Sequence, residues 1–323
     1  MKKSYFSRAL GLCVVAAFLA DCGVAQPPFG VPGATSQSSA ATTRNTEYAH
    51  SAQLLYVGNV SDYDDVKVYP ANDKDPSPIA IISDNLDTPT GDCISAAGTL
   101  YVVNEPAGSG WVTEFAAGKT TSSEIIKDGI DTPAFCAIDG SGNLWVTNIG
   151  GQNVTEYEKG SLKPHTIITK GLFYPDGIAI DQTGNMYVAN HYTEGTKSFA
   201  PGNVVIYPPG GKSPKRTITN GIASPVGIAV DGKGTLYVAN VKENNVEVYR
   251  HDESQPYETL TEGVNNPVAV TVNKAGWLYV TNDGNNVVIE FAPDSLKPSR
   301  RQVSKGLDGP FGTAYYPPLL GKN

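Results

Sequence analysis

The chain has 323 residues, of which 40% are hydrophobic and 17% are charged, so it can bury a sizeable core. Its formal net charge is −8 and no stripe of basic residues interrupts the sequence, which argues against a nucleic-acid binder because phosphate contacts need clustered Lys and Arg. With 34 Gly, 23 Pro and 2 Met, the composition favours short strands and tight turns over long helices.

Residues 1–22 have the form of an export signal: a positively charged start and then an apolar run, residues 9–20, that is too short to span a bilayer comfortably. The run ends at Leu19-Ala20-Asp21-Cys22, which resembles a bacterial lipobox, in which the Cys is lipidated. Asp21 stands where a lipobox has a small residue, and Gly23-Val24-Ala25 offers an ordinary cleavage site instead. We expect an exported protein, periplasmic or at the cell surface, with a lipid anchor at Cys22 as one of two alternatives.

Residues 23–52 contain mainly small and polar residues, with Pro and few large apolar side chains. Such a stretch cannot bury enough surface to offset the entropy of ordering, so it predicts a flexible tether. The globular domain is expected over residues 53–318, followed by a short tail, residues 319–323.

A repeated segment dominates the rest of the chain. Its six copies start 45, 44, 42, 50 and 42 residues apart, and a period in the forties accommodates four short strands and their turns. The copies are Leu55-Tyr56-Val57-Gly58-Asn59, Leu100-Tyr101-Val102-Val103-Asn104, Leu144-Trp145-Val146-Thr147-Asn148, Met186-Tyr187-Val188-Ala189-Asn190, Leu236-Tyr237-Val238-Ala239-Asn240 and Leu278-Tyr279-Val280-Thr281-Asn282.

The neighbouring strands repeat as well. A strand opened by Pro-x-Gly, as in residues 225–231, precedes most copies; an alternating third strand such as residues 246–249 and a polar fourth strand such as residues 216–219 follow. The first two strands are apolar on both faces and the last two carry charge, as expected for blades of a propeller. The sequence therefore predicts an all-β, six-bladed β-propeller of four-stranded antiparallel blades.

The order of the strands also predicts how the ring closes. The chain enters the domain at a second-type strand, residues 54–58, and ends with an unpaired first-type strand after Pro310. Residues 309–316 should therefore pair with residues 54–59 and complete the first blade.

The Pro-x-Gly-Ile-Ala-Val-Asp, Gly-x-Leu-Tyr-Val-Ala-Asn and Val-x-Val-Tyr elements resemble the NHL-repeat family of six-bladed propellers, over residues 54–316. This resemblance implies the fold but not one activity, because members and relatives include peptidyl-hydroxyglycine lyases, gluconolactonase-like hydrolases, virginiamycin-lyase-like proteins and protein-binding domains.

The chemistry that such enzymes need is hard to find in the sequence. Of the four His, His50 lies in the tether and His165 and His251 lie at outer positions, so a three-His metal site is not expected. The Asn that ends each repeated segment recurs in all six blades, which favours a role in turn geometry over a metal site. No catalytic residue, metal ligand or cofactor is therefore predicted; calcium would enter only if the chain were a gluconolactonase-like enzyme.

One blade departs from the other five. Where they have small or polar residues before the Pro of the first strand, this blade has Phe173 and Tyr174, followed by Asp176. It also has the longest loop between the second and third strands, which contains His191, Tyr192 and Glu194. Both loops should open on one face, so these six residues predict a binding patch at the rim. The alternative is a local cluster in which the aromatic residues simply pack under the loop.

Cys93 and Cys136 fall in the innermost strands of consecutive blades, offset by one position. Side chains alternate along a strand, so the two thiols should point into the same seam, where export would permit a disulfide. The alternative is a pair of buried free thiols.

The leading interpretation is a monomeric, exported binding or interaction scaffold whose partner is a protein, a glycan or a small molecule. The alternative is a lyase or hydrolase with a divalent cation in the channel. Whether the chain is an enzyme stays undecided, although the lack of a recognisable catalytic set argues against it.

Overall fold

A computed structural model describes residues 53–60, 63–193, 200–293 and 295–319. The chain divides into residues 1–45 and residues 46–323, and every described residue belongs to the second unit. The predicted signal, most of the tether, Cys22 and Glu194 lie outside the described residues. No helix within the described ranges is long and apolar enough to span a membrane.

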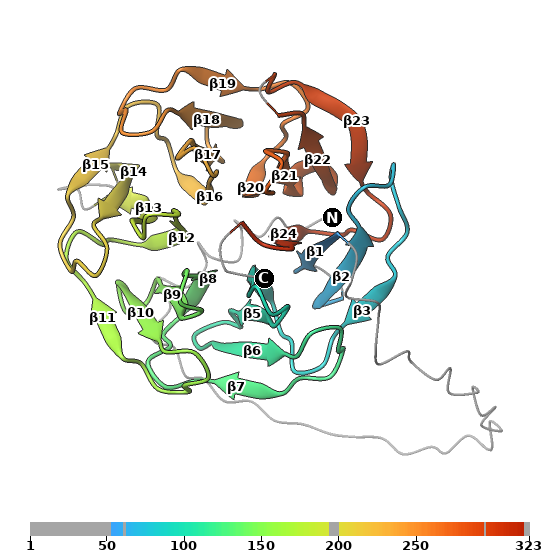
Figure 1. Cartoon of the computed structure of the whole chain (residues 1–323), viewed down its shortest axis with the longest axis horizontal. Helices are drawn as coiled ribbons and strands as arrows, with labels where there is room; N and C mark the ends of the chain where they lie inside the picture. The colour runs from blue at the N-terminus through green and yellow to red at the C-terminus, as the bar shows by residue number, and fades with distance from the viewer. Residues whose placement is uncertain (1–52, 61–62, 194–199, 294, 320–323) are drawn as a thin grey trace, which may run out of the picture. The chain divides into compact units, whose positions relative to one another are not determined.

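The strands form six four-stranded antiparallel sheets arranged in a ring, which confirms the predicted propeller (Figure 1). The blades are numbered in chain order. Blade 1 consists of β24 (Pro310–Tyr316), β1 (Leu54–Asn59), β2 (Asp65–Pro70) and β3 (Ala80–Ile82). Blade 2 consists of β4 (Pro89–Ile94), β5 (Leu100–Asn104), β6 (Trp111–Phe115) and β7 (Glu124–Ile126). Blade 3 consists of β8 (Pro133–Ile138), β9 (Leu144–Asn148), β10 (Asn153–Tyr157) and β11 (Thr166–Ile168).

Blade 4 consists of β12 (Pro175–Ile180), β13 (Met186–Thr193), β14 (Ala200–Tyr207) and β15 (Arg216–Ile218). Blade 5 consists of β16 (Pro225–Val230), β17 (Leu236–Asn240), β18 (Asn245–Tyr249) and β19 (Glu258–Leu260). Blade 6 consists of β20 (Pro267–Val272), β21 (Leu278–Asn282), β22 (Val287–Phe291) and β23 (Pro298–Val303), with the short 3₁₀ helix η2 (Asp283–Asn285) after β21.

The ring closes as the sequence predicts. The C-terminal strand β24 pairs antiparallel with β1, from Leu54 opposite Tyr316 to Asn59 opposite Pro310. A hydrogen bond from the Tyr69 hydroxyl to the Lys305 carbonyl, 2.8 Å long, also joins blade 1 to the segment that follows blade 6. Closure of this kind gives blade 1 its innermost strand, so that β1 is paired on both sides.

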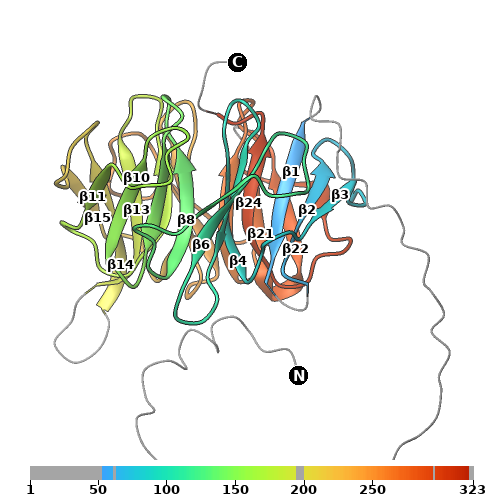
Figure 2. The same ribbon diagram turned by 90° about the horizontal axis from the view of Figure 1, so that it is seen from below.

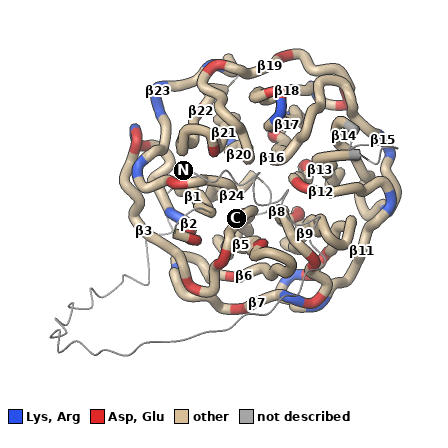
Figure 3. The backbone as a smooth tube through the Cα atoms, turned by 180° about the vertical axis from the view of Figure 1, so that it is seen from behind, with Lys and Arg blue, Asp and Glu red and all other residues tan. Residues whose placement is uncertain are grey.

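The hydrophobic core is divided among the seams between blades. Innermost strands such as β4, β12 and β16 are buried at every position, whereas fourth strands such as β11 and β15 bury only their last residue. Each described cluster joins two neighbouring blades; Ile228 of blade 5, for example, packs in one cluster with Ala189 of blade 4. The gradient from apolar inner to polar outer strands therefore matches their position in the ring. Acidic and basic residues are interspersed around the periphery (Figure 3).

The two faces of the ring differ in the loops that they carry. The rim face carries the turns before each first strand and the loops between second and third strands. The opposite turn face carries the Asp-x-x-Gly turns between first and second strands, such as residues 139–143. In blade 4, β13 and β14 have eight residues each, and β14 extends past the neighbouring strands on the rim face (Figure 2).

Candidate functional site

The Asn that ends each repeated segment has the same structural role in all six blades. Its side-chain oxygen accepts a hydrogen bond from the backbone N–H two residues before the Pro of the first strand, at 3.0–3.1 Å. Examples are Asn104 with Asp87 and Asn190 with Phe173. These side chains therefore hold the turn before each first strand, and the repeat explains them without a ligand.

Blade 4 carries a cluster of aromatic rings on the rim face. Tyr174 lies before β12, and His191 and Tyr192 lie in the part of β13 that extends beyond the repeat. The ring centroids are 6.0 Å apart for Tyr174 and His191, 5.5 Å for Tyr174 and Tyr192, and 4.3 Å for His191 and Tyr192. The two loops thus meet on one face. Tyr174, Asp176, His191 and Tyr192 are hereafter called the rim cluster.

Tyr174 occupies a backbone conformation that is unusual for a bulky residue. Its φ is 58°, in the left-handed region. The residues before the Pro in the other five blades share this conformation and are all smaller than Tyr, although two of them are β-branched: Thr88, Thr132, Ser224, Asn266 and Gly309. The left-handed φ therefore belongs to the repeat, and what distinguishes blade 4 is the large aromatic side chain at this position.

Asp176 and His191 form a buried pair beneath the two tyrosines. The His191 Nδ1 atom lies 3.4 Å from an Asp176 carboxylate oxygen, and the two side chains are only 5% and 10% exposed. Burial raises the pKa of the Tyr192 hydroxyl, and the nearby Asp176 carboxylate raises it further. Tyr192 is therefore a neutral hydrogen-bonding group in this cluster at any physiological pH.

The other residues predicted for the site lie in different places. Phe173 is half-buried and directly precedes the rim cluster, where its N–H is held by Asn190. Glu194 and Cys22 lie outside the described residues. Cys93 of β4 and Cys136 of β8 are joined by a disulfide across the seam between blades 2 and 3, with a Cα–Cα distance of 5.7 Å.

The central channel offers a second candidate site. It holds a cavity of about 160 Å³, lined by the innermost strands of all six blades and by Pro318 and Leu319. The rings of Phe135 and Phe311, from blades that are not neighbours, lie 5.9 Å apart and fill part of the axis. The cavity is smaller than the 300–1,000 Å³ or so that holds a drug-sized ligand.

Asp92 of β4 lies beside this channel, at a position where other blades have Ile178, Ile228 or Val270. Its side chain is buried in the seam between blades 1 and 2, against the glycines Gly58 and Gly312, where a Cβ would meet the carboxylate at 3.3 and 2.9 Å. Among the described residues, neither carboxylate oxygen has a hydrogen-bond partner of good geometry. Burial raises the pKa of Asp92 to about 7, against a smaller lowering by the Gly58 amide.

Metal-ligating side chains do not converge in the described ranges: no group of three or more His, Cys, Asp or Glu is placed to hold an ion. His165, in blade 3, and His251, in blade 5, lie on outer loops, and their side chains are 58% and 49% exposed. Among the described residues that line the channel, Asp92 is therefore the one carboxyl, and no set of metal-ligating side chains surrounds it.

The sequence patterns of the loops and turns did not reveal two residues that the structure singles out, Asp92 and Trp145. Both depart from the repeat, as Tyr174 does: Asp92 replaces an apolar residue, and Trp145 replaces the Tyr of the other five repeated segments. Comparing the strands of the six blades position by position, as was done for the loops, identifies both residues.

No protein-family model matches the sequence, and no curated protein matches it. Solved structures do resemble it. A chain in the crystal structure of a nidogen/laminin complex is 16% identical, with a TM-score of 0.67 over 82% of this chain and 98% of that one. A Bacteroides fragilis protein provisionally assigned as a 6-phosphogluconolactonase is 14% identical, with a TM-score of 0.60 over 83% and 99%. A Bacteroides caccae protein of unknown function is 13% identical, with a TM-score of 0.61 over 82% and 99%. At such identities the likeness shows the fold alone.

Proposed function

We propose that this chain is an exported propeller of the NHL-repeat kind that binds a partner protein through the rim cluster of blade 4. The observation that carries the proposal is Tyr174, a large aromatic residue at a turn position that the five other blades give to smaller, non-aromatic residues. Its ring lies against those of His191 and Tyr192.

Such a cluster suits protein recognition. Tyrosines supply large, rigid contact area together with a hydroxyl, and they are enriched among residues that dominate binding energy at interfaces. The buried Asp176–His191 pair fixes the imidazole beneath them, so little side-chain entropy would be lost on binding. The nidogen/laminin structure is a protein complex that contains a propeller of similar fold, which agrees with this use of the architecture.

The test is site-specific photo-crosslinking in the cells that make the protein. A benzoylphenylalanine at position 174 should give a discrete high-mass adduct, whereas the same residue at position 132, the matching turn of blade 3, should not. Replacing His191 with Ala in the position-174 variant should weaken the adduct. Equal labelling from positions 174 and 132, or no adduct from either, would overturn the proposal.

The second candidate is an enzyme that works in the channel, as the gluconolactonase-like relatives of the resemblance would. Asp92 is the observation that favours it, because a carboxyl with a pKa near 7 can act as a general acid or base at neutral pH. The purified protein separates the two candidates. Stoichiometric, tightly held calcium or zinc would support the enzyme, and its absence from an active binding protein would support the scaffold.

A further inference from the structure

A groove of about 550 Å³ lies between blades 3 and 4 on the turn face, opposite the rim cluster. Its walls come from the Asp-x-x-Gly turns of the two blades, from Trp145 and Glu156 of blade 3, and from residues 207–212 of blade 4. This volume falls within the range of about 300–1,000 Å³ that is usual for small-molecule sites. No residue of the rim cluster lines it, and Ile180 is the residue that it shares with the lining of the channel cavity.

Trp145 distinguishes this seam from the others. In the other five repeated segments the same position is a tyrosine that is at most 7% exposed, whereas Trp145 is half-buried and lines the groove. Its indole N–H donates to an Asp139 carboxylate oxygen at 3.1 Å, and Glu156 lies opposite it on β10. The hydrogen bond fixes the ring while part of its surface stays open to the groove.

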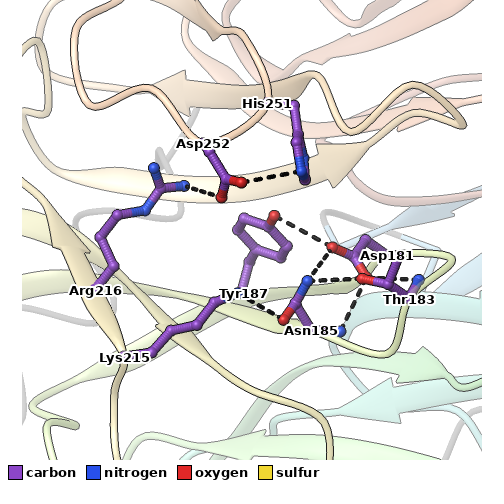
Figure 4. Close-up of polar contacts among 8 residues, drawn as sticks. All are labelled: Asp181, Thr183, Asn185, Tyr187, Lys215, Arg216, His251 and Asp252. Atoms are coloured by element: carbon purple, nitrogen blue, oxygen red, sulfur yellow. Dashed lines mark hydrogen bonds and ion pairs between the residues drawn. The ribbon is translucent and has the colours of Figure 1, made fainter.

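The next seam around the ring shows why this one is open. Between blades 4 and 5, Arg216 of β15 reaches across to Asp252 at 3.7 Å, and His251 contacts the same carboxylate at 3.1 Å (Figure 4). Tyr187 is buried beneath them and donates to Asp181 at 3.3 Å. Aligning the blades on their third-strand tyrosines places Thr166, Gly210 and Pro209 at the positions of Arg216, Asp252 and His251. At these three positions the seam between blades 3 and 4 therefore lacks the charged side chains that bridge the next seam.

We propose that this groove binds the pyranose ring of a neutral glycan against the indole of Trp145. A pyranose has an apolar C–H face, which is attracted to the negative face of an aromatic ring, and a rim of hydroxyls that both donate and accept hydrogen bonds. Glu156 supplies an acceptor oxygen beside the one that accepts from Asn143, and Lys212 and Ser141 supply donors around the groove. The inference does not rest on the rim cluster or on the proposed protein partner.

The charges around the groove favour a neutral ligand over an ion. The Asp139 and Asp181 carboxylates are already occupied by their own turns: Asp139 accepts from Ser141, Asn143 and Trp145, and Asp181 accepts in the same way within its turn. Glu156 on blade 3 and Lys212 on blade 4, which line the groove together with His165, have opposite charges, so an anion or a cation would meet one like charge.

Saturation-transfer NMR and calorimetry with the whole exported chain test the proposal. The probes are the methyl glycosides of glucose, galactose, mannose and N-acetylglucosamine, together with their oligosaccharides. We expect at least one of them to bind saturably with a Kd of about 1 mM or tighter. Trp145→Tyr, which introduces the residue of the other five blades, should weaken that binding about fivefold, since aromatic contacts of this kind contribute about 1 kcal/mol.

Two further variants keep the outcome decisive. Trp277→Tyr changes a half-buried tryptophan of blade 6 and should leave binding unchanged. Thr166→Arg with Gly210→Asp rebuilds the bridge of the neighbouring seam while keeping Trp145, and should abolish binding; Gly210 and Asp252 have similar φ angles, 65° and 60°, and a side chain at Gly210 meets nothing within 4 Å. The proposal is wrong if no glycan in the set binds or if all variants bind equally.

Discussion

Two seams of the ring differ at one equivalent position. They are the seam between blades 1 and 2 and the seam between blades 6 and 1. In both, the fourth residue of an innermost strand faces the residue before the repeated Asn of the preceding blade. Thr313 meets Thr281 there, and the two hydroxyls share a short hydrogen bond. Asp92 meets Gly58, and its carboxylate has no such partner of good geometry in the described chain.

The difference between the two seams shows that backbone geometry fixes the position but not the chemistry within it. Other blades place Ile or Val there, and blade 3 places Cys136, which bonds to Cys93 of blade 2. The ring tolerates an apolar contact, a covalent bond, a hydroxyl pair or a lone carboxyl, because the strands and their turns are held independently by the six repeated Asn. A costly occupant such as Asp92 is therefore a feature of this chain and not of the fold.

The largest expected effect concerns Asp92. Its pKa is raised in the folded state, from 3.8 to about 7, so the folded chain holds a proton that the unfolded chain releases. The stability contributed by the protonated carboxyl is fully present below about pH 4 and is lost as the pH rises through 7. About three pH units at about 1.4 kcal/mol each amount to about 4 kcal/mol.

Asp92→Asn removes this titration without changing the shape of the side chain. Both proteins should be unfolded in urea from pH 4 to pH 8. Across that range, the free energy of unfolding of the variant should rise by about 4 kcal/mol relative to that of the wild type. Asp92→Val, which introduces the residue of blade 6, should raise the free energy of unfolding at every pH because it adds apolar packing. Parallel stability profiles for wild type and Asp92→Asn would show that the carboxyl is solvated or paired.

The disulfide between blades 2 and 3 should have the next largest effect on stability. It closes a loop with a sequence separation of 43 residues, for which chain entropy predicts about 3–4 kcal/mol of stabilisation. Cys93→Ala with Cys136→Val introduces residues that other blades have at these positions, so packing should change little. We expect the pair to lower the free energy of unfolding by about 3 kcal/mol and to make it insensitive to reductant. Two free thiols in the denatured, non-reduced wild type would contradict the bond.

Particular residues show how far the sequence could lead. The period of the repeated segments determined the six blades, and the lone strand after Pro310 determined the closure, because both depend on local pattern. The loops of blade 4 were found by their departure from that pattern. Strand alternation also placed Cys93 and Cys136 in one seam, but other contacts between blades could not be found in this way: Gly58 lies against Asp92, and Phe135 against Phe311, only because the ring brings distant strands together.

The smallest expected effect comes from the hydroxyl pair of Thr281 and Thr313. It tests whether this position in the seam between blades prefers polar or apolar side chains. Thr281 is fully buried and Thr313 is 7% exposed, so removing one hydroxyl leaves the other without a partner in the seam. Thr281→Ala and Thr313→Val should each cost about 1–3 kcal/mol. The double variant copies the Ala239 and Val270 of the seam between blades 5 and 6 and should be nearly as stable as the wild type. A double-mutant cycle in urea would then give a coupling of about 2 kcal/mol or more, the sum of the two single losses. Additive losses would instead mean that the threonine hydroxyls act separately, and that the contrast with Asp92 lies in charge alone.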